Sequence, residues 1–276
     1  MSRNNPDRTG AHGPDSAPPP EVLKTLEFVA PTELVDLPSR GQYPEGHPLS
    51  GKESVEIRFM TAKDEDILTN QSLLKKGLAI ERFLQNVILD KSIRSEDLLI
   101  CDRNAILVAA RSSGYGSDYD TKVQCPNCGT TNQISFDLAS PLIEPASYPD
   151  EYNISVEEGQ VFVTPPLTGF KIGLRLLTGR DENFLAKQMT DKKNKDKANI
   201  TQQFRLMITS VQGDSSRNTI DYYVDRMPTQ DSRYLRAAYA FISPSLKISE
   251  DLECHSCGYE QEMEVPFGAD FFWPDR

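Results

Sequence analysis

Four of the five cysteines in this chain form two Cys-x-x-Cys pairs, Cys125 with Cys128 and Cys254 with Cys257. Two cysteines spaced in this way around a tight turn can direct both sulfurs at one ion, and the glycine after each pair suits the left-handed backbone of such a turn. Each pair offers half of a tetrahedral set of thiolates, in which Zn–S bonds are about 2.3 Å long. We therefore predict one structural zinc ion per chain, held by these four cysteines.

Other interpretations of the cysteine pairs remain open. Zinc ribbons usually place their pairs roughly 15 to 20 residues apart, whereas about 125 residues separate Cys128 from Cys254 here. The pairs could instead be unrelated turns in which cysteine serves as a small apolar side chain. A thioredoxin-like dithiol needs a pair that opens a helix, but both pairs precede strand-like sequence. His255 lies between two candidate ligands and is a candidate fifth donor, although four thiolates already complete the coordination.

Residues suited to catalysis are scarce elsewhere. A metal with four thiolate ligands has no open position for an activated water, which favours a structural site. Of the three histidines, His47 alone lies outside both the N-terminal tail and the cysteine pairs, so a histidine-dependent catalytic set would rest on it. The carboxylates at 64–66 fit the first turn of a helix better than a cation site, and Cys101 fits a buried small side chain. We predict that the protein is not an enzyme.

The charge of the chain excludes several partners. It carries 41 acidic and 30 basic residues, a formal net charge of -11, and this field repels nucleic acid and anionic lipid. No stretch approaches the roughly 18 to 20 apolar residues of a membrane span, and the first residues lack the apolar segment of a secretion signal. We expect neither nucleic acid nor membrane as a partner, and synthesis in a reducing cytoplasm.

Three parts of the chain precede the first cysteine pair. Residues 1–22 are rich in proline and small polar residues, which predicts a disordered tail. Residues 23–60 are expected to form an extended arm and a strand. Residues 61–116 are expected to form a helical subdomain, because apolar residues recur there at helical spacing and Thr61 can cap the first helix.

The remaining residues, 117–276, contain both cysteine pairs. Alternating apolar residues on either side of each pair predict two β-hairpins, 117–140 and 245–268, with the cysteines at their tips. A mixed strand and helix segment, 150–243, is inserted between them. Within this segment we expect strands at 160–164 and 170–176 and helices at 181–189, 200–211 and 229–242. The lysine-rich residues 191–197 are expected to form a solvated loop. The fold class is α+β, with helical subdomains joined to β-hairpins that form a four-cysteine zinc-ribbon-like module.

Several blocks of sequence carry a family resemblance. They are Leu37-Pro-Ser-Arg-Gly-Gln-Tyr, Met60-Thr-Ala-Lys-Asp-Glu-Asp-Ile-Leu-Thr, Leu74-Lys-Lys-Gly-Leu-Ala-Ile, Asp102-Arg, Ala110-Arg-Ser-Ser-Gly-Tyr-Gly, the two cysteine pairs and Phe271-Phe-Trp-Pro. In this order, over roughly residues 35–275, the chain resembles the baseplate hub and hub-assembly protein family of T4-like contractile-tailed bacteriophages. The resemblance implies a non-catalytic structural or assembly protein of the virion tail, made in the host cytoplasm, whose partners are other phage baseplate and tail proteins.

The main alternative is a zinc-ribbon adaptor in transcription or RNA processing. Such a protein would carry a basic face around a cysteine pair, but Lys122 and Lys247 are nearly alone there. The aromatic residues Phe271, Phe272 and Trp273 are typical of interface anchors, and they are equally suited to close the core of the domain. The sequence predicts no particular oligomeric state.

Overall fold

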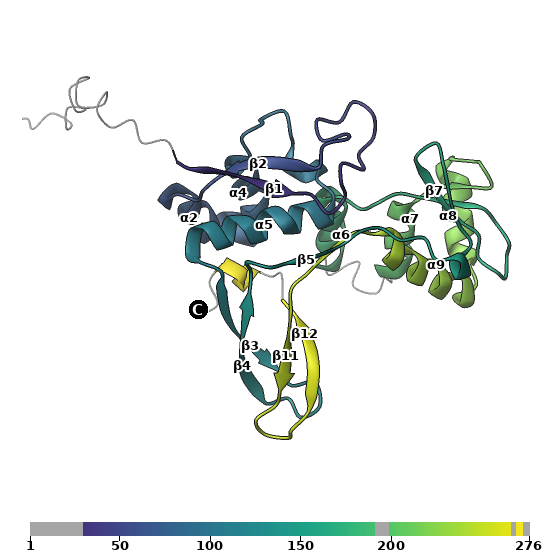
Figure 1. Ribbon diagram of the computed structural model, residues 1–276. Helices are drawn as coiled ribbons and strands as arrows, with labels where there is room; N and C mark the ends of the chain where they lie inside the picture. The colour runs from purple at the N-terminus through teal and green to yellow at the C-terminus, as the bar shows by residue number, and fades with distance from the viewer. Residues whose placement is uncertain (1–29, 191–198, 266–268, 273–276) are drawn as a thin grey trace, which may run out of the picture. The chain divides into compact units, whose positions relative to one another are not determined.

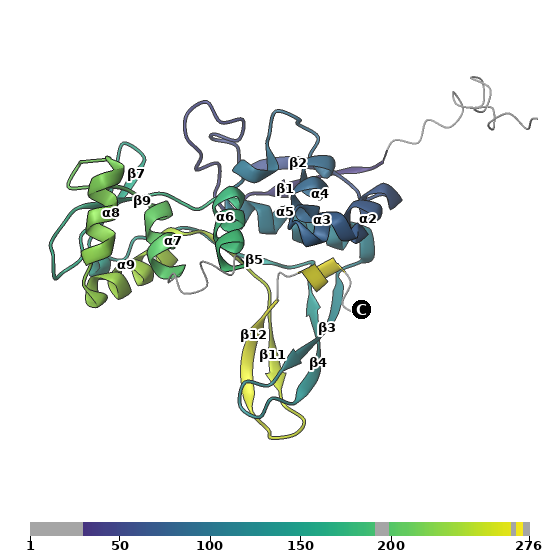
Figure 2. The same ribbon diagram turned by 180° about the vertical axis from the view of Figure 1, so that it is seen from behind.

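A computed structural model describes residues 30–190, 199–265 and 269–272 (Figures 1 and 2). The tail at 1–22, the lysine-rich loop at 191–197 and Trp273 lie outside the described residues. Helices combine with antiparallel strand pairs in the part that is described, which confirms the α+β class. None of the described helices is long and apolar enough to cross a membrane.

The first part of the described chain pairs two strands and follows them with helices. β1 runs antiparallel to β2, with Val35 opposite Val55. The bounds are β1 Thr32–Asp36, β2 Ser54–Arg58, α2 Ala62–Thr69, α3 Gln71–Lys75, α4 Ala79–Val87, the 3-10 helix η2 Ser95–Asp97 and α5 Ile100–Tyr115. After α5 come the hairpin strands β3 Asp118–Gln124 and β4 Thr131–Asp137, and the short strand β5 Leu142–Glu144.

The later part begins with a four-stranded antiparallel sheet in the order β6-β7-β8-β9. Its elements are the 3-10 helix η3 Asp150–Tyr152, β6 Ile154–Glu157, β7 Gln160–Val163, β8 Ile172–Leu174, α6 Gly179–Thr190, α7 Asn199–Met207, β9 Ile208–Val211, α8 Arg217–Arg226 and α9 Thr229–Ile242. The described part ends with β10 Ser245–Lys247, β11 Ser249–Glu253, β12 Glu260–Glu264 and the 3-10 helix η4 Ala269–Phe272.

One expected helix is shorter than predicted. The helix expected at 200–211 ends at Met207, and the next four residues form β9. Ile208 and Val211 are β-branched and buried, and they pair with β8, so sheet pairing overrides the helical spacing of the preceding residues. α8 was not predicted, because its sequence is mostly polar and buries few apolar residues, Ile220 and Val224 among them.

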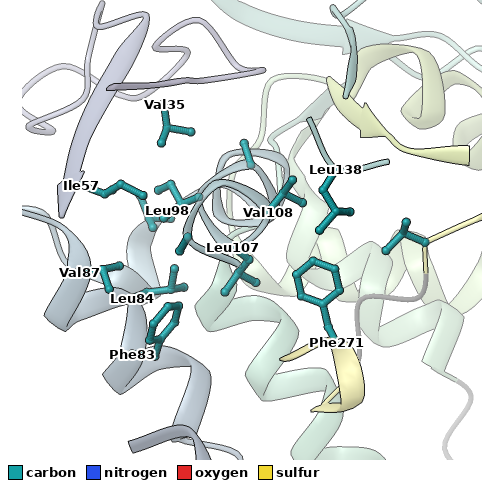
Figure 3. Packing of buried hydrophobic residues seen from close by; sticks show 14 of the residues in the cluster. Val35, Ile57, Phe83, Leu84, Val87, Leu98, Leu107, Val108, Leu138 and Phe271 are labelled. Carbon is teal, nitrogen blue, oxygen red and sulfur yellow. The ribbon is translucent and has the colours of Figure 1, made fainter. Parts of the chain in front are cut away.

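Two hydrophobic cores hold these elements. One is formed by β1, β2, α4, α5 and the bases of the cysteine hairpins, as the side chains around α5 show in Figure 3. Phe271 and Phe272 belong to it: each is 2% exposed, and the Phe271 ring lies 5.1 Å from that of Tyr119. These two aromatics therefore close the core, and the interface interpretation is wrong for them. The second core lies between the four-stranded sheet and α7, α8 and α9.

Two strand–helix junctions, far apart in the sequence, are built alike. Arg58 ends β2, and its guanidinium donates to the two carboxylate oxygens of Asp64 at 2.7 and 2.9 Å. Asp64 also accepts from the N–H and the hydroxyl of Thr61, both at 2.8 Å, and so fixes the start of α2. The same bonds, at 2.7 to 3.0 Å, join Arg175, Thr178 and Asp181 between β8 and α6.

A buried aspartate near the start of a long helix is the second shared feature. Asp102 in α5 is fully buried and accepts from the N–H of Ser39 at 2.9 Å and from its hydroxyl at 2.6 Å. Asp231 in α9 is also fully buried and accepts from the N–H groups of Leu167 and Thr168 at 3.1 and 3.0 Å. Each aspartate thus anchors the loop that joins two paired strands.

These features belong to an internal repeat of the whole unit. The matching pairs are β1 and β7, β2 and β8, α2 and α6, α4 and α7, α5 and α9, β3 and β11, and β4 and β12. We call residues 32–137 the first repeat and residues 160–264 the second repeat. From the sequence only the two cysteine hairpins were seen as related. Because each repeat ends in one hairpin, the long separation between the cysteine pairs is the length of one repeat.

Candidate metal centre

The two cysteine pairs lie at the tips of two hairpins that run side by side, with β11 beside β4 (Figures 1 and 2). In the first hairpin the N–H of Cys125 donates to the carbonyl of Thr130 at 2.9 Å, and that of Gly129 donates to the carbonyl of Cys125 at 2.8 Å. The second hairpin makes the matching bonds at 2.9 and 2.8 Å, from Cys254 and Gly258. Both glycines have a positive φ, +73° and +65°, so the predicted role of glycine holds in each turn.

The turns bring the four sulfurs together. The Sγ atoms of Cys125 and Cys257 are 3.8 Å apart, and those of Cys128 and Cys254 are 3.7 Å apart. All four ligand atoms lie within 4.8 Å of one another. A regular tetrahedron with Zn–S bonds of about 2.3 Å has sulfurs about 3.8 Å apart. The arrangement could hold a metal ion, and the spacing fits zinc.

One cysteine of each pair is buried against the hairpins. Cys125 and Cys254 are buried, whereas Cys128 and Cys257 are exposed. The apolar residue two positions before each buried cysteine, Val123 or Leu252, belongs to the core beneath the site. The hairpins are therefore fixed at their bases by packing, and the sulfurs at their tips lie together because of it.

Two asparagines donate to the sulfurs of the second pair, and the sequence analysis did not identify either. Asn132 is buried in β4, and its side-chain amide lies 3.6 Å from the Sγ of Cys254. The side-chain oxygen Oδ1 of Asn132 accepts a hydrogen bond from the backbone N–H of His255 at 3.2 Å. The amide of Asn127 lies 3.6 Å from the Sγ of Cys257. Such donors orient ligands and offset thiolate charge. The available signal was a polar residue at an inward-facing position of an alternating strand.

Hydrogen bonds and neighbouring sulfurs shift the pKa values of several of these thiols. The backbone N–H of Ser256 is the main cause that lowers the pKa of Cys254 to about 6. Hydrogen bonds from Thr130 lower the pKa of Cys128. For Cys257 the backbone N–H of Tyr259 acts to lower the pKa, but partial desolvation and the sulfurs of Cys128 and Cys254 outweigh it and raise the pKa to about 11. Four thiols at these distances cannot all ionise unless a cation compensates their charge.

Other candidate residues lie outside this cluster. His255 is exposed and does not belong to the group of four ligand atoms. The His47 ring stacks on Tyr43 with centroids 4.2 Å apart, and burial lowers the pKa of this histidine. Cys101 is half-buried, and burial raises the pKa of its thiol. For Asp64, burial acts to raise the pKa, but its hydrogen bonds, from Arg58 first, outweigh it and lower the pKa.

A comparison with family models gives one match. The model of the family described as "T4 bacteriophage base plate protein" matches residues 32–273, from the first residue of β1 through both repeats and both cysteine pairs. This is most of the chain, so the chain belongs to that family, and the resemblance of the sequence blocks to T4-like baseplate proteins is confirmed. No curated protein and no solved structure gives a match.

Proposed function

We propose that this chain, a member of the T4 bacteriophage base plate protein family, is a non-catalytic structural or assembly protein of the hub of a contractile tail baseplate. One structural zinc ion, bound by Cys125, Cys128, Cys254 and Cys257, would hold its two repeats together at their hairpins. The observation that carries the proposal is a closed set of four sulfurs at zinc spacing in a chain of this family.

Zinc rather than another metal is supported by the chemistry of the ligands. Four cysteine sulfurs in a tetrahedral arrangement are typical of structural zinc and of iron–sulfur proteins. The Sγ distances of 3.7 and 3.8 Å fit a single ion bonded to all four sulfurs. Because such a site exists only in the folded chain, the free energy of metal binding would also stabilise the fold. The site would therefore act as a cross-link between two hairpins that are distant in sequence.

A role without catalysis is supported by the closed coordination. Four protein ligands leave no position for a substrate or an activated water. Of the remaining candidates, His47 stacks on Tyr43 and Cys101 is half-buried. The baseplate role also implies a position in the virion tail after synthesis and assembly in the host cytoplasm, with other tail and baseplate proteins as partners.

The alternative of a zinc-ribbon adaptor for nucleic acid gains no support from the site. One face of the second hairpin exposes a row of carboxylates, Asp251, Glu253, Glu260, Glu262 and Glu264. Lys247, one of the two basic residues near the cysteines, is paired with Glu144 at 2.9 Å. A phosphate backbone would be repelled by this face.

Co-expression with the other tail and baseplate proteins of the same phage tests the proposal. We expect a stable complex that includes hub proteins, contains about one zinc per copy of this chain and retains no nucleic acid at physiological salt. Binding of RNA or DNA in the absence of binding to any tail protein would replace the proposal with the adaptor function. Localisation of the chain at the periphery of isolated baseplates would retain the baseplate role and remove the hub.

A further inference from the structure

The two repeats differ at the outer edge of their paired strands. In the second repeat β7 is covered on its outer edge by β6, which pairs with it antiparallel from Ile154 opposite Val163 to Glu157 opposite Gln160. In the first repeat the counterpart of β7 is β1, which pairs only with β2 among the described strands. No strand in the described part of the chain occupies, in the first repeat, the edge that β6 occupies in the second, and we call this the open edge of β1.

The backbone groups of β1 at this edge can be assigned from the ladder. The N–H of Leu37 donates to the carbonyl of Glu53 on the β2 side at 2.8 Å. Hydrogen-bonded pairs alternate along an antiparallel ladder, so Leu34 and Asp36 direct their N–H and carbonyl groups away from β2. In the second repeat the counterpart of Asp36 is Thr164, whose N–H donates at 3.2 Å to the carbonyl of Asn153, just before β6. The open edge thus presents the groups that the second repeat uses.

A groove of about 410 Å³ runs beside this edge, and it is lined by β1, by α5 and by residues 138–141, Ile143 and Leu246. The α5 residues along it include the small residues Ala105, Ala109 and Ser112. In α9 the residues at the corresponding positions are Tyr234, Ala238 and Phe241. There the ring of Tyr152, which precedes β6, packs against both aromatics, with centroids 5.3 Å from Tyr234 and 5.1 Å from Phe241. The first repeat therefore leaves space for side chains that the second repeat supplies from its own chain.

The residues just before β1 cannot supply this strand by the same turn. β6 and β7 are joined by Glu158 and Gly159, which have positive φ angles of 49° and 78°, as a two-residue hairpin turn requires. Ala30 and Pro31 stand at the corresponding positions. Proline is restricted to φ near about −65°. A strand at the open edge must therefore be joined to β1 in another way or come from another chain.

We propose that the open edge of β1 binds an extended segment of another baseplate protein as an added antiparallel strand. A bulky apolar side chain of that segment would lie over Ala105, Ala109 and Ser112. The choice of a baseplate protein as the source rests on the proposed function, whereas the site itself rests on the repeat.

The charges at the edge favour a segment that carries a lysine or arginine. Glu33 and Asp36 line the groove, and one carboxylate oxygen of Glu33 is buried without a hydrogen-bond partner among the described residues. A second copy of this chain would place β1, Thr-Glu-Leu-Val-Asp, against itself, and this strand is acidic and contains no basic residue. Like charges across an antiparallel pair are destabilising. A basic partner segment is complementary, whereas a second copy is not.

Two variants of the full-length protein test the site, each co-expressed with the tail and baseplate proteins of the same phage. Ser112→Phe introduces the residue that the second repeat has at this position and fills the groove. Asn104→Phe places the same ring on a half-exposed part of α5 outside the groove and serves as the matched control. We expect Ser112→Phe to weaken partner binding at least tenfold and the control to leave it within twofold, with zinc content unchanged in both.

A second readout keeps the test independent of folding effects in Ser112→Phe. Leu34 is 71% exposed, so Leu34→Lys should leave the fold intact. The charge that it places on the edge opposes strand addition, so this variant should also weaken partner binding. Amide exchange at Leu34 and Asp36 should slow at least tenfold when the wild-type protein enters the complex. A complex that forms without this protection overturns the inference and leaves the proposed function standing. If no tail protein binds the wild-type chain, both the inference and the proposed function fail.

Two other occupants would also overturn the inference. Protection of Leu34 and Asp36 in the isolated protein that disappears when residues 1–29 are deleted would assign the edge to the chain's own N-terminal segment. Protection that rises with protein concentration together with dimer formation would assign it to a second copy.

Discussion

Replacement of Asp102 by alanine should destabilise the first repeat strongly. Its carboxylate is fully buried and accepts from the N–H and hydroxyl of Ser39, and from the hydroxyl of Tyr43 at 2.7 Å. Each buried donor left without a partner costs about 1 to 3 kcal/mol. Three donors give roughly 3 to 9 kcal/mol, and we expect about 3 to 5 kcal/mol because hydroxyls can rotate toward other acceptors or water. Domains are stable by only about 5 to 15 kcal/mol.

Amide exchange measured separately in the two repeats is the appropriate assay, because β1, β2, α4 and α5 pack in one core, whereas β7, β8, α7 and α9 pack in the other. Asp102→Ala should lower the free energy of opening in the first repeat by that amount. The matched variant Asp231→Ala removes the acceptor of two backbone N–H groups and should lower it in the second repeat by about 2 to 4 kcal/mol. A loss below about 1 kcal/mol for Asp102→Ala would refute the reasoning. If Asp102→Asn, which preserves the volume, is as stable as the wild type, the cavity and not the lost hydrogen bonds causes the effect.

Three further predictions concern other parts of the fold. Cys125→Ser and Cys254→Ser should each abolish zinc binding and lower the melting temperature sharply, because metal binding and folding are coupled; unchanged melting curves would show that these cysteines only pack. The pKa of Asp64 is lowered in the folded chain, so the stabilisation by this carboxylate should be complete above its unfolded pKa of about 3.9 and be lost as the pH falls through the lower folded value. The difference in unfolding free energy between the wild type and Asp64→Asn should therefore shrink between pH 6 and pH 2, and a difference that grows would contradict this assignment. Gly41→Ala should lower the unfolding free energy strongly, because φ is +76° and the new Cβ would lie 2.5 Å from a backbone nitrogen. Gly169→Ala has open space around the new Cβ and should cost only the backbone strain, so equal losses of stability in the two variants would contradict the steric argument.

The cluster of four cysteines could be predicted because its pattern is local. A Cys-x-x-Cys pair followed by glycine and flanked by alternating apolar residues specifies one turn and one hairpin, and both hairpins formed as expected. The meeting of the two pairs depends on the one core that lies under both hairpins, and it could only be inferred from thiolate chemistry. Asn132 could not be assigned, because its contact with Cys254 crosses from one hairpin to the other.

The internal repeat escaped sequence reasoning because only a few side chains preserve it. The Arg-x-x-Thr-x-x-Asp junctions and the buried aspartates recur, but the loop after β1 is longer than the loop after β7, and the apolar residues differ. Ile57 pairs with Ile88 as a single bridge, whereas the second repeat extends the same pairing into β9. The burial of Phe271 and Phe272 was equally hidden, since the same aromatic residues can anchor an interface or a core.

X-ray absorption at the zinc edge, together with elemental analysis of the full-length protein purified under reducing conditions, tests the central claim most directly. We predict about one zinc per chain, with four sulfur neighbours at about 2.3 Å and no nitrogen or oxygen ligand. Absence of metal, or a zinc ion with fewer than four sulfurs and a bound water, would contradict the structural site.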